Sequence, residues 1–243
     1  LTFFVLRYHW RYPLWLCMFA TGFFMLIDAV FFAAAMHKVL DGGWFPLALG
    51  LIVFFIMVTW RRGREMLLER LTRSSPPLEG FLTSLFRHPP HRVPGSAVFL
   101  TSSPGTTPNA LLHSLKHYKV LHEQNIFLTV EFRDVPWVQP EDRVECDRLS
   151  GDCWRVVARY GFMERPDVAL VLEVCAPQGL TLDPIQVSYF LSREKIVPAA
   201  DGKGMSIWRD RLFAAMARNA GNITDFFNIP TNQVVELGTR VNL

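Results

Sequence analysis

Cysteine is scarce in this chain, and its spacing excludes the common metal motifs. The four cysteines are Cys17, Cys146, Cys153 and Cys175, and no two of them form a C-x-x-C pair. A structural zinc site requires closely spaced ligand pairs. We therefore expect no metal, and we expect reduced, unpaired thiols, as is usual in the cytosol.

Catalytic and nucleic-acid-binding signatures are also missing. The chain contains no G-x-S-x-G, H-E-x-x-H or organised Ser/His/Asp spacing. Its net charge is only +3, and no Lys/Arg tract follows a nucleic-acid-binding pattern. The acidic residues Asp134, Glu141, Asp142 and Glu145 surround an expected turn, and we interpret them as solvated charge. The sequence predicts neither an enzyme nor a nucleic-acid-binding protein.

Charge is almost absent between Pro13 and Trp60, where only Asp28, Lys38 and Asp41 are charged. This pattern predicts two spans, over about residues 13–36 and 43–60, within a transmembrane part that covers residues 1–62. The two helices would be about 36 Å and 26 Å long, and the hydrocarbon core of a bilayer is about 30 Å thick. Because the connection between them is short, we expect an antiparallel hairpin in contact with membrane lipid.

Basic residues flank the two expected spans unequally. The connecting loop has only Lys38, whereas the outer flanks carry Arg7, Arg11, Arg61, Arg62, Arg64 and Arg70. The positive-inside rule places the flanks rich in Lys and Arg in the cytoplasm. We therefore expect a multi-pass protein of the cytoplasmic (inner) membrane, with everything after about residue 61 in the cytoplasm.

Asp28 is the one acidic residue in the middle of an expected span. A charged side chain at that depth is costly and often marks an ion or proton pathway. The alternative is a structural acid that is buried between helices and satisfied by a hydroxyl, a backbone group or a basic partner. Both interpretations stay open at the level of sequence.

The rest of the chain is charged and contains turn residues. Residues 63–95 combine a basic, helix-forming run with two proline clusters, and we expect them to form a cytoplasmic linker. The run itself suits either a surface helix or an extension of the second span. From residue 96 to residue 243, apolar strand-like runs alternate with helical patterns, which predicts a mixed α/β cytoplasmic domain.

One loop of this domain is a candidate anion site. It joins an expected strand at 97–101 to an expected helix at 110–118, which Thr107 would cap, and its candidate residues are Ser102, Ser103, Gly105, Thr106 and Thr107. Backbone N–H groups at a helix start favour anions, so a regulatory nucleotide such as ATP or cyclic di-AMP is one hypothesis. Because no Gly-Lys-Ser/Thr follows, a polar loop before a capped helix is the favoured interpretation.

Three histidines lie close together in the sequence, at His113, His117 and His122. The first two are one helical turn apart, a spacing that suits a metal ion. No Cys or carboxylate stands at a matching position beside them, so we expect a solvated helix face.

Five stretches carry a resemblance to a known family. They are DGGWFPLALG (41–50) leading to TWRRGR (59–64), HRVPGSAVFLT (91–101), LKHYKVLHEQNIFLT (115–129), WRVVARYGFMERPDV (154–168) and IPTNQVVELGTRV (229–241). In this order, behind a membrane hairpin, the chain resembles the KUP/HAK/KT family of potassium uptake permeases. The resemblance covers nearly the whole chain.

The resemblance implies a secondary transporter of about a dozen spans that imports K⁺ by symport with H⁺, without a cofactor and as a homodimer. Such permeases hold their ion at interrupted helices near the midplane. Those helices belong to an earlier part of the family's chain, so the ion-binding residues are unknown here and expected outside this sequence. The first residue is Leu rather than Met, and we expect a fragment. The alternative is a membrane-tethered nucleotide-sensing or interaction module with two spans.

Overall fold

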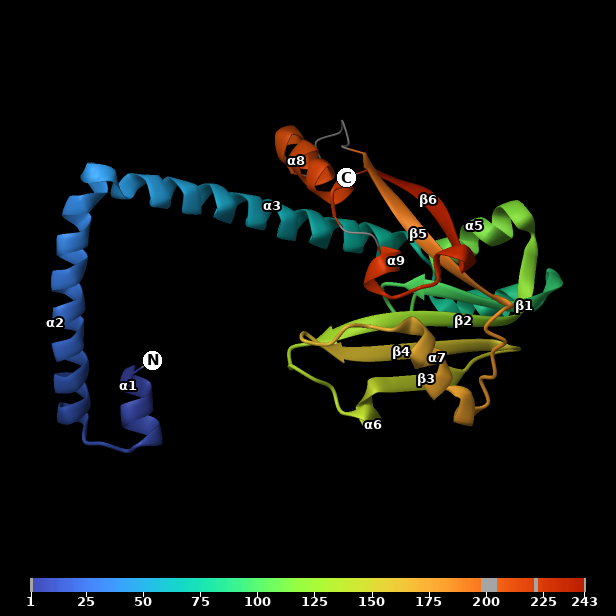
Figure 1. The fold of residues 1–243 in the computed structure, drawn as a ribbon, viewed down its shortest axis with the longest axis horizontal. Helices are drawn as coiled ribbons and strands as arrows, with labels where there is room; N and C mark the ends of the chain where they lie inside the picture. Colours follow the sequence, from blue (N-terminus) through green and yellow to red (C-terminus); the bar gives the residue numbers. More distant parts are fainter. Residues whose placement is uncertain (1, 198–204, 221–222, 243) are drawn as a thin grey trace. The chain divides into compact units, whose positions relative to one another are not determined.

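The computed structural model describes residues 2–197, 205–220 and 223–242 (Figure 1), and the chain divides into two compact units, Leu1–Val58 and Thr59–Leu243.

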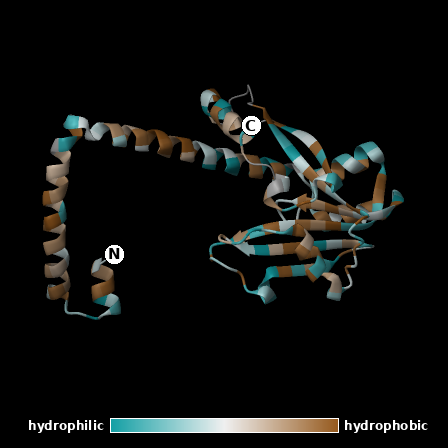
Figure 2. Cartoon of the chain, viewed as in Figure 1, coloured by the Kyte–Doolittle hydropathy of each residue, from teal (hydrophilic) through white to brown (hydrophobic). Residues whose placement is uncertain are grey.

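The first unit is helical. It contains α1 (Thr2–Phe4), a π-helical turn (Val5–His9), α2 (Leu14–Lys38), a second π-helical turn (Val39–Gly43) and the beginning of α3 (Trp44–Ser74). The chain turns at Asp41 and Gly42, where Gly42 adopts a φ of 124° that disfavours any other residue. The helices at Leu14–Met36 and Asp41–Arg73 are long and apolar enough to cross a membrane, and Figure 2 shows their hydrophobic stretches. This confirms two apolar helices, whereas the antiparallel hairpin stays a prediction.

The second unit is a mixed α/β domain, as the sequence predicts. After the end of α3 it contains α4 (Leu78–Leu85), β1 (His91–Thr101), α5 (Asn109–Tyr118), β2 (Val120–Arg133), α6 (Pro140–Arg143), β3 (Val144–Arg148), β4 (Cys153–Gly161), α7 (Val168–Val174), a 3₁₀ turn (Ala176–Gln178), β5 (Val187–Val197), α8 (Ile207–Arg218), α9 (Ile223–Phe226), a 3₁₀ turn (Thr231–Gln233) and β6 (Val234–Asn242).

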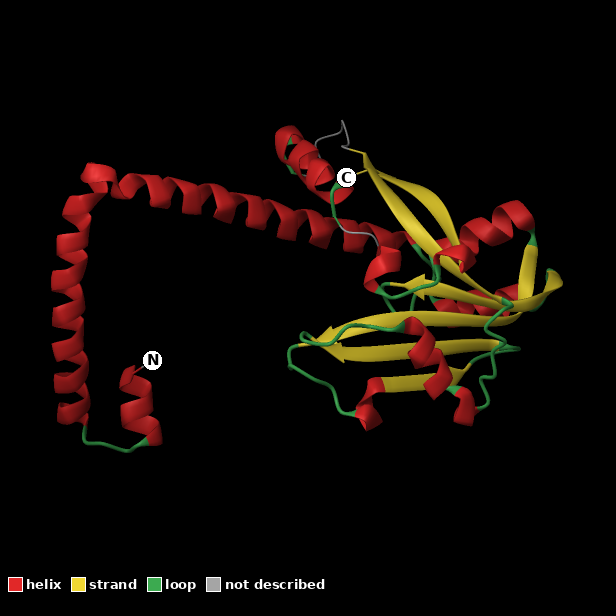
Figure 3. Cartoon of the chain, viewed as in Figure 1, coloured by secondary structure: helices red, strands yellow, loops and turns green. Residues whose placement is uncertain are grey.

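The six strands form one sheet in the order β3-β4-β2-β1-β5-β6. Every neighbouring pair is parallel except β3 and β4, so only β3 at one edge runs the other way (Figure 3). Alternate residues of each strand face opposite sides of the sheet. Val98, Ile126 and Val156 therefore pack under α7 on one side. Ala97, Phe99 and Phe127 pack under α4 and α5 on the other.

A third apolar cluster lies at the ends of β5 and β6. Its buried members are Leu67 of α3, Phe213 of α8, and Met205, which precedes α8. Ile196 and Val241 pack against them. The basic helical run after residue 61 is thus an extension of α3, the second of the two alternatives that the sequence leaves open.

Candidate functional site

The sheet has a topological switch point between β1 and β5. The chain proceeds from β1 to β2 and β4 on one side, and then returns to place β5 and β6 on the other side of β1. In open α/β sheets, ligands bind outside the carboxyl ends of the strands at such a point. The loop from Ser102 to Thr107, which follows the carboxyl end of β1, is the predicted anion loop. The structure therefore places the candidate residues where this fold class holds its ligands.

Several polar groups of this loop bind one another. The Ser103 N–H donates to Thr101 Oγ1 at 3.4 Å, while the Thr106 N–H and hydroxyl donate to the Ser103 carbonyl at 3.4 and 3.2 Å. These bonds fold the loop into a compact turn. Gly105 lies at its tip, where a Cβ atom would meet nothing within 4 Å.

The segment between α3 and α4 lies against this loop. The Thr107 N–H and hydroxyl both donate to the Pro76 carbonyl, at 3.0 and 2.9 Å. In return the Leu78 N–H donates to the Gly105 carbonyl at 3.0 Å, and the Ser75 hydroxyl donates to Asn109 Oδ1 at 3.3 Å. We call residues 75–78 the docking segment. The switch point is thus the place where the chain coming from α3 is fixed to the sheet.

The prediction that Thr107 caps α5 is wrong. The helix begins at Asn109, its N-cap residue is Pro108, and the Thr107 hydroxyl binds the docking segment instead. Thr107 is only 1% exposed, and a buried hydroxyl must find an acceptor. As a cap, this hydroxyl would accept a hydrogen bond from a backbone N–H of the helix. Here it donates to a carbonyl 31 residues away in the sequence.

Sequence reasoning treated residues 63–95 as a linker and missed how firmly they join the domain. Leu78 and Leu82 of α4 are each 1% exposed and belong to the core under the sheet. Their i, i+4 spacing places them on one face of a helix, and this was the available signal. It was weak because α4 has only 8 residues.

The end of α3 forms a tight seam with α8. Phe213 is fully buried, and its ring centroid lies 5.5 Å from that of Trp60. A Cβ atom built on Gly63 would lie 2.3 Å from the Phe213 ring, so only glycine fits there. A glycine inside a helix costs about 1 kcal/mol relative to alanine, and such a glycine in the sequence signals a close approach of this kind.

Charged groups border the seam. Asp210 of α8 is 2% exposed, and burial raises its pKa, opposed by Arg70 of α3 and by Arg209. Arg209 Nε donates to Thr59 Oγ1 at 3.3 Å. Burial likewise raises the pKa of Glu194 on β5, opposed by Arg64. Arginines of α3 thus partly offset the effect of burial on the acids of α8 and β5.

The remaining predicted positions lie on other elements than the anion loop. Asp28 lies within α2, in the other unit, and its side chain is exposed there. The rings of His113 and His117 stack on α5 with centroids 6.1 Å apart, whereas His122 lies on β2 against Phe190. Across residues 2–197, 205–220 and 223–242, no three His, Cys, Asp or Glu side chains gather as a metal site.

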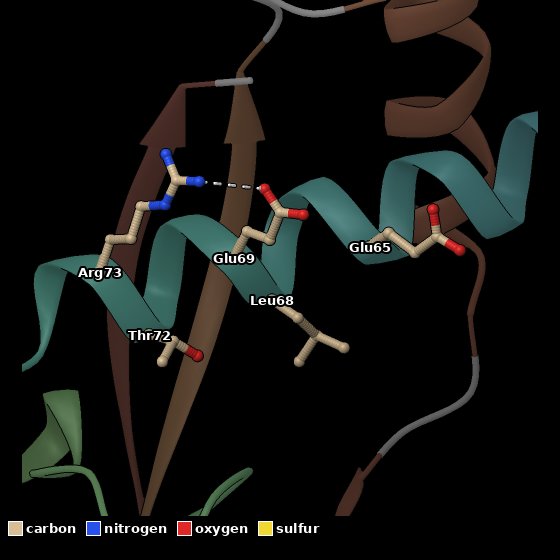
Figure 4. A pocket seen from close by; sticks show the side chains of 5 residues that line it. All are labelled: Glu65, Leu68, Glu69, Thr72 and Arg73. Atoms are coloured by element: carbon tan, nitrogen blue, oxygen red, sulfur yellow. Dashed lines mark ion pairs between the residues drawn. The ribbon is translucent and has the colours of Figure 1, made fainter.

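A hollow of about 430 Å³ follows the last turns of α3 and is lined by Glu65, Leu68, Glu69, Thr72 and Arg73 (Figure 4). Arg73 and Glu69 form an ion pair of 3.6 Å, but their side chains are 82% and 61% exposed. Exposed pairs of this kind contribute little. The hollow lacks the buried polar groups that a ligand site needs, so the switch point remains the candidate site.

Comparison with known proteins agrees with this organisation. The model of the K+ potassium transporter integral membrane domain matches residues 1–65, and that of the K+ potassium transporter C-terminal domain matches residues 94–243. No solved structure matches.

Curated relatives match over the whole chain. The probable potassium transport system protein Kup of Methylibium petroleiphilum is 53% identical over 243 residues, which are 100% of this chain and 38% of the relative. The protein of the same name in Nitrosospira multiformis is 51% identical with the same coverage. Kup 2 of Cupriavidus necator is 52% identical over 245 residues, 100% of this chain and 39% of the relative. The chain thus spans about two fifths of the length of these relatives, and it belongs to the K+ potassium transporter (Kup) family.

Proposed function

We propose that this chain is the carboxyl-terminal part of a permease that moves potassium ions into the cell. The observation that carries the proposal is the match to both family domains in their order, 1–65 and 94–243, at about half identity to relatives named as potassium transport proteins. The two apolar helices supply membrane spans for such a protein. In this proposal it is a secondary transporter without a cofactor, and the ion-binding residues lie outside this sequence.

The finer points extend the same proposal. The protein is a multi-pass protein of the cytoplasmic membrane and works as a homodimer. Residues after about 61 lie in the cytoplasm, because the Lys and Arg residues concentrate outside the short connection between the spans. Coupling to protons by K⁺:H⁺ symport follows from the family resemblance.

Rubidium uptake tests the transport proposal. A protein that contains this chain is expressed in cells that lack potassium uptake, and uptake is measured at two external pH values. We expect uptake that rises at acidic pH. Absence of uptake from a protein shown to reach the membrane would overturn the proposal, and pH-independent uptake would remove the proton coupling alone.

Asp28 provides a second test. A charged side chain inside a membrane span costs free energy, and such residues often belong to an ion or proton pathway. If Asp28 takes part in the ion or proton pathway, Asp28→Asn lowers rubidium uptake or abolishes its pH dependence. Unchanged uptake and unchanged pH dependence would assign Asp28 a structural role. Asp41→Asn, in the turn between the two helices, is the matched control.

A second candidate function is nucleotide sensing by the sheet domain. The observation that favours it is the position of Ser102, Ser103 and Gly105 at the switch point. A bound phosphate there would lie beside the docking segment, so that binding could alter how the chain from α3 is held. Calorimetric titration with ATP and with cyclic di-AMP tests this, and absence of heat with both would remove it.

A further inference from the structure

A second surface, away from the docking segment, also lies at the end of the sheet where the parallel strands terminate. The loops that follow β2 and β4, with α9 beside them, expose large apolar side chains. Trp137 and Phe162 are each 64% exposed, Met163 is 63% exposed, and Phe132, Val135 and Phe226 are 44–56% exposed. We call these six residues the aromatic rim. Single exposed hydrophobic residues are normal, but a contiguous set of them marks an interaction site.

Contacts link the parts of the rim. The rings of Phe132 and Phe226 are 5.9 Å apart between centroids. The Phe162 N–H donates to the Val135 carbonyl at 3.0 Å, and the Met163 N–H donates to the Pro136 carbonyl at 3.2 Å. These two bonds join the loop after β2 to the loop after β4.

A nearly buried carboxylate holds the two loops together. The Glu164 side chain is 10% exposed and pairs with Arg143. One of its oxygens accepts the N–H groups of Gly161 at 2.7 Å and Val138 at 3.1 Å. A Cβ atom on Gly161 would lie 2.2 Å from the Pro136 carbonyl oxygen, so the loops approach as closely as glycine allows. These contacts therefore hold the backbone of the two loops that carry the exposed rings.

The rim shares its edge of the sheet with the segment that leads to the candidate span. Because β1, β2, β4, β5 and β6 are parallel, their carboxyl ends lie along one edge. The rim follows the carboxyl ends of β2 and β4, and Leu67 of α3 packs with Ile196 and Val241 near the carboxyl ends of β5 and β6. The same helix, α3, continues backwards into the apolar stretch that is long enough to span a membrane.

The chemistry of the rim suits the boundary between lipid headgroups and acyl chains. Tryptophan and other large aromatic residues are favoured at that depth. The two loops, residues 134–139 and 162–167, carry one basic residue, Arg165, and three acidic residues, Asp134, Glu164 and Asp167, so no charge attraction draws them to anionic lipid. A domain tied covalently to membrane spans also meets the bilayer at a high effective concentration.

We propose that the aromatic rim docks on the surface of the bilayer that holds the chain's own spans, with Trp137, Phe162 and Met163 entering the interface. The contact is apolar and independent of anionic lipid. It gives the sheet domain a second attachment to the membrane besides α3.

A fluorophore on a single introduced cysteine tests this in the full chain reconstituted in phosphatidylcholine vesicles. Met163→Cys places the label in the rim. Ile185→Cys places it at a side chain that is 86% exposed before the start of β5, at the opposite edge of the sheet. Burial raises the pKa of Cys153 and Cys175 to about 12 and so suppresses labelling of these two thiols. The unsubstituted chain measures the background from all four native cysteines, Cys17 and Cys146 included.

Nitroxide-bearing lipids in the vesicles should quench the label at position 163 about threefold or more strongly than the label at position 185. The difference should persist between about 50 and 500 mM salt, since no charge attraction is involved. Adding Trp137→Ser and Phe162→Ser to the Met163→Cys chain should reduce the quenching to the level at position 185.

Two results would overturn the proposal. Equal quenching at positions 163 and 185 would show that the rim does not reach lipid. Weak quenching by lipid at position 163, combined with energy transfer between labelled copies, would show that a second copy of the chain covers the rim.

Discussion

Gly63 is the residue on which the seam between α3 and α8 depends most directly. A methyl group there would overlap the Phe213 ring, which is fully buried and cannot move aside. We expect Gly63→Ala to destabilise the sheet domain by about 1–3 kcal/mol, although alanine favours helix. Denaturant unfolding of the domain, followed by the loss of strand signal in circular dichroism, measures this.

Gly80→Ala is the matched control for Gly63→Ala. Gly80 lies in α4, and a Cβ atom there would meet nothing within 4 Å. Helix propensity alone then predicts stabilisation by up to about 1 kcal/mol. Equal effects of the two substitutions would contradict the close packing at the seam.

Glu164 makes the stability of the domain depend on pH. Its hydrogen bonds to the backbone N–H groups of Gly161 and Val138, together with the charge of Arg143, lower its pKa. A lowered pKa in the folded state means that the carboxylate stabilises the fold above the ordinary pKa of glutamate. This contribution is lost as the pH falls through the lowered value.

We therefore expect Glu164→Gln to destabilise the domain at pH 7 by about 1.5–3 kcal/mol and to flatten the loss of stability in acid. Unfolding curves measured from pH 7 down to pH 3 test both effects. Glu173→Gln, at an exposed position of α7, is the control, and an equal response from it would contradict the role of Glu164.

Single residues were the hardest part to predict from sequence. The glycine of TWRRGR and the threonine before Pro108 are visible as letters, but their partners, Phe213 and Pro76, lie 150 and 31 residues away in the chain. Local rules assigned Thr107 to a helix cap because nothing local reveals a tertiary acceptor. The role of Glu164 could likewise not be predicted, because it depends on the contact between the loops after β2 and β4.

At the scale of elements, α4 and the docking segment are structural parts of the domain. Leu78 and Leu82 are almost fully buried, and burying such a side chain contributes about 1.5–3 kcal/mol. We expect residues 94–243 alone, the range that matches the family's C-terminal domain, to be less stable than residues 59–243 by about 3–6 kcal/mol.

Three truncated chains separate the contributions. Residues 59–243 keep the seam, 75–243 keep only the docking segment and α4, and 94–243 keep neither. Their unfolding midpoints should fall in that order, with binding of a hydrophobic dye rising in the last. A chain of 94–243 as stable as 59–243 would contradict the role of both elements.

The elements that were predictable share a buried apolar run. The cores of β1, β2, β4 and β5 and the amphipathic helices α5 and α8 follow from such runs. Strand β3 was missed. Glu145 lies on it, half exposed, and its carboxylate pairs with Arg159 on β4, while Asp147 pairs with Arg155 at 2.7 Å. Cross-strand ion pairs look like a polar loop until the neighbouring strand is known.

At the scale of the whole molecule, three features gather at the end of the sheet where its parallel strands terminate. The docking segment reaches the carboxyl end of β1, the seam reaches those of β5 and β6, and the aromatic rim follows β2 and β4. A ligand site of the ordinary doubly wound kind would share this end of the sheet.

Family membership was predictable because five motifs occur in a fixed order, although no single motif decides it. What the sequence could not supply is the ion path, since this chain spans 38% of the Methylibium petroleiphilum relative. The transport proposal is therefore tested with this chain placed in the context of such a relative.

The most direct test exchanges this chain for the matching part of that relative, with which it shares 53% identity over 243 residues. The chimera and the unaltered relative are expressed in cells that lack potassium uptake, and rubidium uptake is measured in both. If this chain is the carboxyl-terminal part of a potassium permease, the chimera takes up rubidium as the unaltered relative does. A chimera that reaches the membrane and takes up none, beside an active relative, would contradict the account.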